Sequence, residues 1–192
     1  SAKRCSMGGT LAKIKGSVCF DCYALKGNYN YPVVKNALEK RYATLADMEA
    51  WVKNFILALQ GEKFFRWFDS GDLQSVEMLE AINRIALSTP TIKHWLPTKE
   101  HVLIRDYLAS GKTFAPNLTV RLSAFLVDSF RTVKIPSVKK SMVASALVYG
   151  AIQSNRDRDS SVNVCPAPMQ GGKCLDCRAC WSDVETIVYK KH

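Results

Sequence analysis

Apolar residues recur at helical spacing along three stretches of the chain. Residues 33–60 place apolar side chains three or four positions apart, and residues 75–88 and 100–110 repeat this spacing. Ser75 stands where a helix N-cap is expected, and Gly111 follows the third stretch directly, where glycine commonly ends a helix. These three stretches are therefore predicted to be helical.

Shorter runs that are rich in aromatic and β-branched residues are predicted to be strands. They are residues 63–72 (a strand closed by a turn), 93–99, 118–124, 145–150 and 185–191. Strands and helices alternate over most of the chain, so we expect an α/β fold with a largely parallel sheet. With 192 residues, 47% of them hydrophobic and 23% charged, the chain has the composition of one globular domain with a core, spanning residues 1–192.

The apolar runs are too short to cross a membrane, so no membrane association is expected. The first residues, SAKRCSMGG, contain no apolar segment of the kind found in a secretory signal, which predicts a cytoplasmic protein. Disulfides are then the least favoured use of the seven cysteines, because cytosolic thiols are kept reduced and an odd number leaves one unpaired.

The formal net charge is +10, and residues 131–140 (RTVKIPSVKK) contain no acidic residue. A basic surface of this kind is one way to bind nucleic acid or a host protein. An ordinary solvated loop explains the stretch equally well. Iron–sulfur clusters bound by thiolates would also carry negative charge that offsets part of the excess.

Four cysteines lie in CPAPMQGGKCLDCRACW, residues 165–181. Cys174, Cys177 and Cys180 form a C-x2-C-x2-C run, and Cys165 begins a Cys-Pro pair upstream, as in ferredoxin cluster sites. The glycine pair at 171–172 gives the intervening loop the freedom to fold back. An iron–sulfur cluster is favoured, and zinc is the alternative, although zinc sites more often use two C-x2-C pairs that are further apart.

The other three cysteines are Cys5, Cys19 and Cys22. Three thiolates indicate either a cubane whose fourth iron takes a ligand from elsewhere, or a cubane with one iron left open. An open iron can bind a substrate, or a cofactor that chelates through amine and carboxylate groups. Alternatively, Cys5 is an idle thiol, and Cys19 and Cys22 complete a single site with the C-terminal cysteines. Two separate clusters are favoured over one, with residues 1–30 and 162–192 as the two cluster-binding segments.

Polar residues follow three of the predicted strands, where the ligands of parallel sheets collect. Asp69, Ser70, Gly71 and Asp72 close the first strand and are candidates for binding a cofactor amine, although this sequence also suits an ordinary turn.

Lys99 and Arg121 belong to the next two strand ends and are candidates for binding a carboxylate or phosphate. Solvated side chains are the simpler interpretation for both.

The segments CFDCYALKGNY, FFRWFDSGDLQS and CP…GGKCLDCRACW together resemble the phage protein family called gene product 88, over nearly the whole chain. Members of that family look like small relatives of radical S-adenosylmethionine enzymes. The resemblance implies a partial (β/α) barrel with cysteine-bound [4Fe–4S] clusters.

The resemblance also implies roles for individual residues. Cys5, Cys19 and Cys22 would hold the open cluster, the turn at 70–72 would face the amine of S-adenosylmethionine, and the four C-terminal cysteines would hold an auxiliary cluster. The chain departs from the usual C-x3-C-x2-C triad, because a much longer segment separates Cys5 from Cys19.

Two functions of different classes follow from these features. One is an enzyme that uses the open [4Fe–4S] cluster on a small molecule, with no catalytic residue assigned. The other is a non-catalytic iron–sulfur or zinc protein with a structural, redox-sensing, nucleic-acid-binding or host-protein-binding role. If the chain is phage-encoded, either protein would act in the cytoplasm of the infected host cell.

Overall fold

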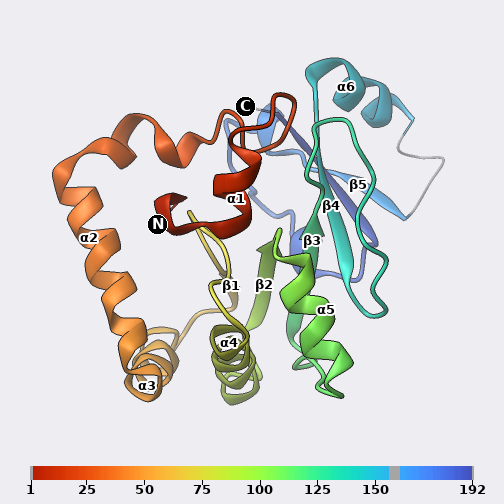
Figure 1. The fold of residues 1–192 in the computed structure, drawn as a ribbon. Coiled ribbons are helices and arrows are strands. Elements are labelled where there is room, and N and C mark those ends of the chain that lie inside the picture. The colour runs from red at the N-terminus through yellow and green to blue at the C-terminus, as the bar shows by residue number, and fades with distance from the viewer. Residues whose placement is uncertain (1, 156–160, 192) are drawn as a thin grey trace.

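The protein is an α/β domain built on a curled, six-stranded parallel sheet that forms half of a barrel (Figure 1). The computed structural model describes residues 2–155 and 161–191. The strands lie in the order β1-β2-β3-β4-β6-β5, and each is parallel to its neighbours. Their bounds are Phe64–Arg66 (β1), Lys93–Thr98 (β2), Leu118–Ser123 (β3), Lys139–Ala144 (β4), Val162–Val164 (β5) and Thr186–Lys190 (β6).

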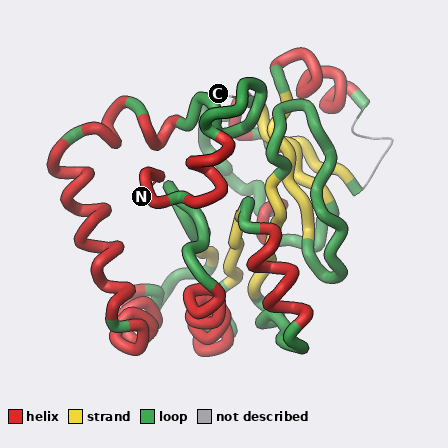
Figure 2. Tube along the Cα trace, viewed as in Figure 1, coloured by secondary structure: helices red, strands yellow, loops and turns green. Residues whose placement is uncertain are grey.

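Helices precede and separate the strands. They are α1 (Ser6–Leu11), α2 (Pro32–Ala43), α3 (Met48–Ala58), α4 (Val76–Ser88), α5 (His101–Ala109) and α6 (Ala146–Ser154). Single 3₁₀ turns cover Ala2–Arg4, Tyr23–Leu25, Gly27–Asn30, Thr44–Ala46, Ala167–Met169 and Ala179–Trp181. All seven cysteines lie in loops or short turns, and none lies within an α-helix or a strand (Figure 2).

The main core lies between the outer face of the sheet and helices α3, α4 and α5. Leu79 and Ile82 of α4 and Leu96 of β2 are fully buried there. Ser75 caps α4 by accepting a hydrogen bond from the Met78 N–H at 3.2 Å, which confirms the predicted start of this helix. A second, smaller core packs α6 against β4, β5 and β6.

The inner, concave face of the sheet is covered by the C-terminal segment. Trp95 of β2 and Ile187 of β6 contact Cys180 there, together with Trp181 and Tyr189. The Trp181 indole N–H donates to the Phe65 carbonyl at 3.0 Å, and this bond ties the end of the segment to β1. The end of the cysteine loop, around Cys180 and Trp181, therefore packs against the inside of the half-barrel.

The predicted α/β class and parallel sheet are confirmed, and two local predictions are wrong. Residues 145–150 form the start of α6 rather than a strand, because the Ser145 hydroxyl accepts from the Val148 N–H and caps a helix. The fourth strand is instead Lys139–Ala144, which overlaps the stretch interpreted as a basic loop. None of the helices in the described part of the chain combines the length and the apolar character that a membrane span requires.

Candidate cysteine centres

The N-terminal cysteine segment lies across the carboxyl ends of the first three strands. In Figure 1, α1 stands at the end toward which β2 points. The Met7 N–H donates to the Glu100 carboxylate at 2.9 Å, just beyond β2. The Val18 N–H donates to the Phe125 carbonyl at 2.9 Å, just beyond β3. These bonds place Cys5, Cys19 and Cys22 at the sheet edge where α/β proteins bind ligands.

Gly8 brings two of the three thiols together. A Cβ atom on Gly8 would lie 2.6 Å from Cys5 Sγ and 3.9 Å from Cys19 Sγ, so the two sulfurs are no further apart than the sum of these distances. Cys22 is an electrostatic neighbour of Cys19. The three cysteines that were predicted from the sequence to form one site therefore lie close together in the structure.

Asp72 and Lys99 belong to the same neighbourhood. Asp72 is buried, and its carboxylate accepts hydrogen bonds from Thr98 Oγ1 at 2.6 Å, the Lys99 N–H at 2.7 Å and the Leu73 N–H at 2.8 Å. Burial raises the pKa of Asp72, and these donors oppose the shift. Burial is the main cause of the raised pKa of Cys5, and the nearby Asp72 carboxylate raises it further.

The rest of the turn after β1 is divided between surface and interior. Asp69 is exposed and accepts a hydrogen bond from the Tyr29 hydroxyl. The Ser70 hydroxyl is buried and has no hydrogen-bond partner among the described residues. Gly71 has a φ of 82°, a conformation that favours glycine. Of the predicted cofactor-binding residues, Asp72 and Lys99 therefore lie near the N-terminal cysteines. Asp69 instead accepts a hydrogen bond from Tyr29 at the surface.

The C-terminal cysteines form a second group. Cys165 directly follows β5, and its backbone N–H donates to the Val188 carbonyl at 2.9 Å. The Cys177 N–H donates to the Cys174 carbonyl at 2.9 Å, which closes the first turn of the cysteine run. Cys174 and Cys177 are electrostatic neighbours of Cys165, and Cys165 and Cys174 are neighbours of Cys180.

Burial governs the acidity of the innermost thiols. It raises the pKa of Cys5 to about 11, with the Asp72 carboxylate as the next cause. It raises the pKa of Cys180 to about 11 as well, against an opposing hydrogen bond with Tyr189, whose hydroxyl lies 3.1 Å from Cys180 Sγ. Both thiols therefore stay protonated near neutral pH unless a metal displaces the proton.

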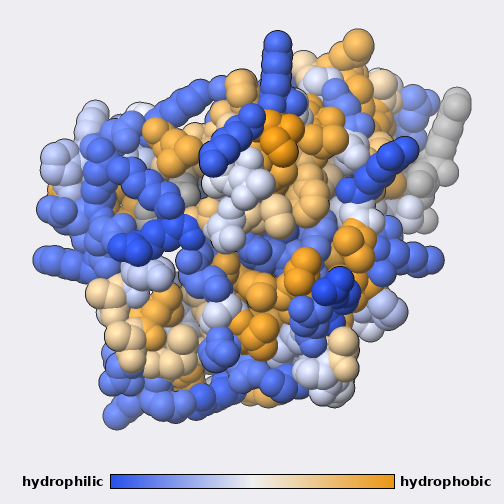
Figure 3. Space-filling view, viewed as in Figure 1, coloured by the Kyte–Doolittle hydropathy of each residue, from blue (hydrophilic) through white to orange (hydrophobic). Residues whose placement is uncertain are grey.

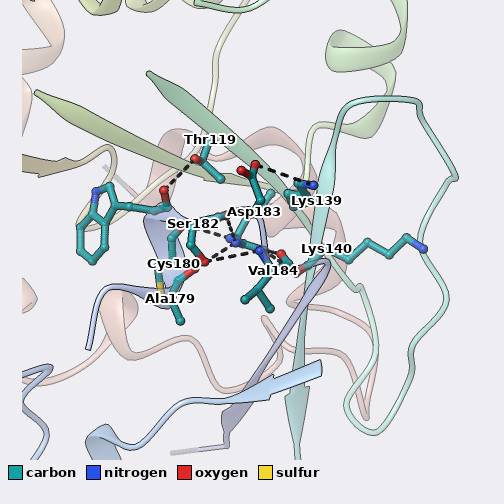
Figure 4. A network of polar contacts seen from close by, with 10 residues as sticks. Thr119, Lys139, Lys140, Ala179, Cys180, Ser182, Asp183 and Val184 are labelled. Atoms are coloured by element: carbon teal, nitrogen blue, oxygen red, sulfur yellow. Dashed lines mark hydrogen bonds and ion pairs between the residues drawn. The ribbon is translucent and has the colours of Figure 1, made fainter. Parts of the chain in front are cut away.

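Arg121 differs most from its expected role. Its side chain is fully buried, and all five of its N–H groups are directed at backbone carbonyls. Four of the acceptors lie in the segment that contains Cys180 (Figure 4). A ligand carboxylate or phosphate would find no free donor on this guanidinium.

All seven cysteines have free thiols. Within the described residues, no group of three or more His, Cys, Asp and Glu side chains is arranged to hold a single metal ion. The ligands of a cubane bind four different irons and stand further apart than ligands on one ion. Free thiols in two groups are a donor set that suits clusters, and metal binding by these groups stays a prediction.

The basic stretch is partly neutralised by its surroundings. Lys139 Nζ lies 4.0 Å from the Asp183 carboxylate, and Lys140 Nζ lies 3.5 Å from the Glu185 carboxylate. Arg131 and Lys134 are exposed. On the face shown in Figure 3, hydrophilic side chains are spread widely rather than gathered in one stripe.

Three residues near the cysteines were not predicted from the sequence. They are Gly8, Glu100 and Tyr189, which contact or hold the cysteine segments through the interactions above. Gly8 could have been found from the sequence, because a glycine stands one helical turn after Cys5. Nothing in the sequence distinguishes Tyr189 from an ordinary tyrosine in a strand.

Comparison with known proteins gives one family. No curated protein and no solved structure matches the chain. The family model described as Gene product 88 matches residues 1–183, which is nearly the whole chain. The chain therefore belongs to the Gene product 88 family, the phage family that its cysteine segments resemble.

Proposed function

We propose that this protein binds iron–sulfur clusters, one at Cys5, Cys19 and Cys22 and one at the four C-terminal cysteines. The observation that carries the proposal is the separation of seven free thiols into two groups of spatial neighbours, at the carboxyl edge and on the inner face of one half-barrel. A run of three cysteines two residues apart is typical of cubane ligation.

The two centres would differ in their ligands. The C-terminal group offers four thiolates, one for each iron of a [4Fe–4S] cluster. The N-terminal group offers three, which leaves one iron without a cysteine. The neighbours of that group are polar, since Asp72 and Lys99 lie at the same sheet edge, together with the Ser70 hydroxyl, which has no hydrogen-bond partner among the described residues.

The finer form of the proposal is a radical S-adenosylmethionine-like enzyme. The N–H groups of an amine chelating the open iron would be donors for the Asp72 carboxylate, and a chelating carboxylate would be opposite in charge to Lys99. The support is the electrostatic proximity of Asp72 to Cys5 and of Lys99 to Cys19.

Cysteine variants test cluster binding and assign the iron. Anaerobically purified protein should contain about eight irons and eight sulfides per chain, as two cubanes require. Replacing Cys5, Cys19 and Cys22 by alanine should leave about four irons, and replacing Cys174 and Cys177 by alanine should also leave about four. Zinc with no iron or sulfide in the unaltered protein would contradict the proposal.

Binding of S-adenosylmethionine is a separate measurement. Calorimetry and EPR on the C174A/C177A protein should show binding and a changed spectrum of the remaining cluster. A normal cluster that neither binds the compound nor changes its spectrum would reject the enzyme form and leave the non-catalytic iron–sulfur protein.

A further inference from the structure

A buried positive charge lies behind the C-terminal cysteines. Arg121 belongs to β3 at the centre of the sheet, and its side chain is fully buried on the inner face. Its Nε donates to the Cys180 carbonyl at 3.0 Å. Its Nη2 donates to the carbonyls of Ser182 at 2.8 Å and Ala179 at 3.0 Å, and Nη1 donates to Val184 at 2.8 Å (Figure 4).

These bonds account for the shape of the segment around Cys180. Residues 179–184 contain one 3₁₀ turn and no strand, so few of their own backbone groups hold the turn together. One guanidinium instead gathers four of their carbonyls at a single point. Arg121 is thus a positioning residue for Cys180.

The hydrogen bonds satisfy the donors of Arg121 but do not neutralise its charge. None of the carboxylates in the described chain accepts a hydrogen bond from it. The nearest acidic side chains along the same segment are Asp183 and Glu185, which lie toward solvent and pair with Lys139 and Lys140. The charges of Asp183 and Glu185 act on Arg121 from a distance, but a buried charge without a hydrogen-bonded counter-ion is still costly, so an anion close by would be favoured.

We propose that Arg121 is the counter-cation of the C-terminal cysteine centre and holds its cluster at a more positive reduction potential. This inference rests on the proposed cluster binding. A cubane with four thiolates carries a net negative charge that grows on reduction, and a fixed positive charge beside it stabilises the reduced form more than the oxidised form.

The test uses the full-length chain with Cys5, Cys19 and Cys22 replaced by alanine, so that only the C-terminal cluster contributes. Its potential is measured by EPR-monitored titration in this parent and in R121M, R121K and K140Q. K140Q is the matched control, because it removes one positive charge from the same region, at a partly exposed side chain paired with Glu185.

R121M should shift the potential to more negative values by clearly more than K140Q does. R121K keeps the charge while losing the forked hydrogen bonds, and its potential should stay close to that of the parent. An R121M protein with an intact cluster at an unchanged potential would overturn the proposal.

If R121M does not fold, R121Q replaces it, because glutamine removes the charge and keeps a side chain that donates hydrogen bonds. A folded R121Q protein should have a potential more negative than that of K140Q, and a potential equal to that of K140Q would overturn the proposal. Absence of iron and sulfide from the parent itself would count against cluster binding by these cysteines, which is a different failure.

Discussion

The Cys5 thiol occupies the space that a side chain on Gly8 would need, with its sulfur 2.6 Å from the position of a Cβ atom there. Real Cβ atoms essentially never approach a neighbour this closely, so any other residue at position 8 must move the thiol or the helix. Cys19 Sγ lies on the same side of Gly8, at 3.9 Å. The glycine therefore sets how the first two thiols of the N-terminal centre face each other.

Gly8→Ala is expected to remove the N-terminal cluster. Iron content should fall from about eight to about four per chain, because the displaced Cys5 can no longer join Cys19 and Cys22 on one cubane. Gly9→Ala is the matched control, since a Cβ on Gly9 meets nothing within 4 Å. Equal iron contents in the two variants would show that Gly8 does not position the centre.

Thiol reactivity in cluster-free protein should follow burial. Cys5 and Cys180, with pKa values of about 11, are almost fully protonated at pH 8, whereas alkylation requires the thiolate. Under anaerobic conditions, iodoacetamide should modify the exposed Cys174 first and these two last, as followed by peptide mass spectrometry.

The pH dependence of the same alkylation reaction shows the direction in which the two pKa values are shifted. Because burial raises the two pKa values above the ordinary 9.0, labelling of Cys5 and Cys180 should keep rising between pH 9 and pH 11. The stability that protonated thiols confer is complete below pH 9 and is lost as the pH rises through 11. Complete labelling of all seven cysteines at pH 8 would rule out this account of the thiols.

Thr98→Val should destabilise the carboxyl edge of the sheet. The Thr98 hydroxyl donates to the Asp72 carboxylate at 2.6 Å and accepts from the Glu100 N–H at 3.0 Å, and the side chain is buried. Removing it leaves both partners short of a bond, at a cost of about 1–3 kcal/mol in the free energy of unfolding.

Urea denaturation of cluster-free protein measures this cost, and Thr98→Ser, which keeps the hydroxyl, should recover most of the loss. Thr10→Val is a surface control, because Thr10 is exposed. A Thr98→Val midpoint equal to that of Thr10→Val would mean that the Thr98 bonds contribute nothing to stability.

Removing the clusters should loosen the cysteine segments more than the helical core. Residues 165–181 have few backbone hydrogen bonds of regular secondary structure, whereas α4 lies in the main core with fully buried side chains. Hydrogen exchange should accelerate in residues 5–22 and 165–181 after chelation, with little change in α4. Unchanged exchange in both cysteine segments would argue that no cofactor orders them.

The alternation of strands and helices predicted the class of the fold, because in most elements the apolar residues recur with the spacing of a helix or a strand. The exceptions have physical causes. Residues 145–150 are a short apolar run that suits a strand or a buried helix equally, and the capping serine at 145 was the signal for a helix. Residues 139–144 begin with two lysines, which made the strand look like the end of a loop.

The cysteine groups were predictable from spacing, but their surroundings were not. In the strand 118–123, alternate side chains point to the same face of the sheet, so Arg121 lies on the face of Thr119 and Ser123. The direction of its side chain could therefore be inferred once the strand was known. What it contacts depends on a segment some sixty residues later that folds over the inner face of the sheet. Only the folded chain brings that segment to Arg121.

An anomalous-difference map recorded at the iron edge, from crystals grown without oxygen, tests cluster binding most directly. Binding of two cubanes should give two compact four-iron peaks, one beside Cys5, Cys19 and Cys22 and one enclosed by Cys165, Cys174, Cys177 and Cys180. A single-atom peak at the zinc edge, or continuous density joining pairs of sulfurs, would contradict it.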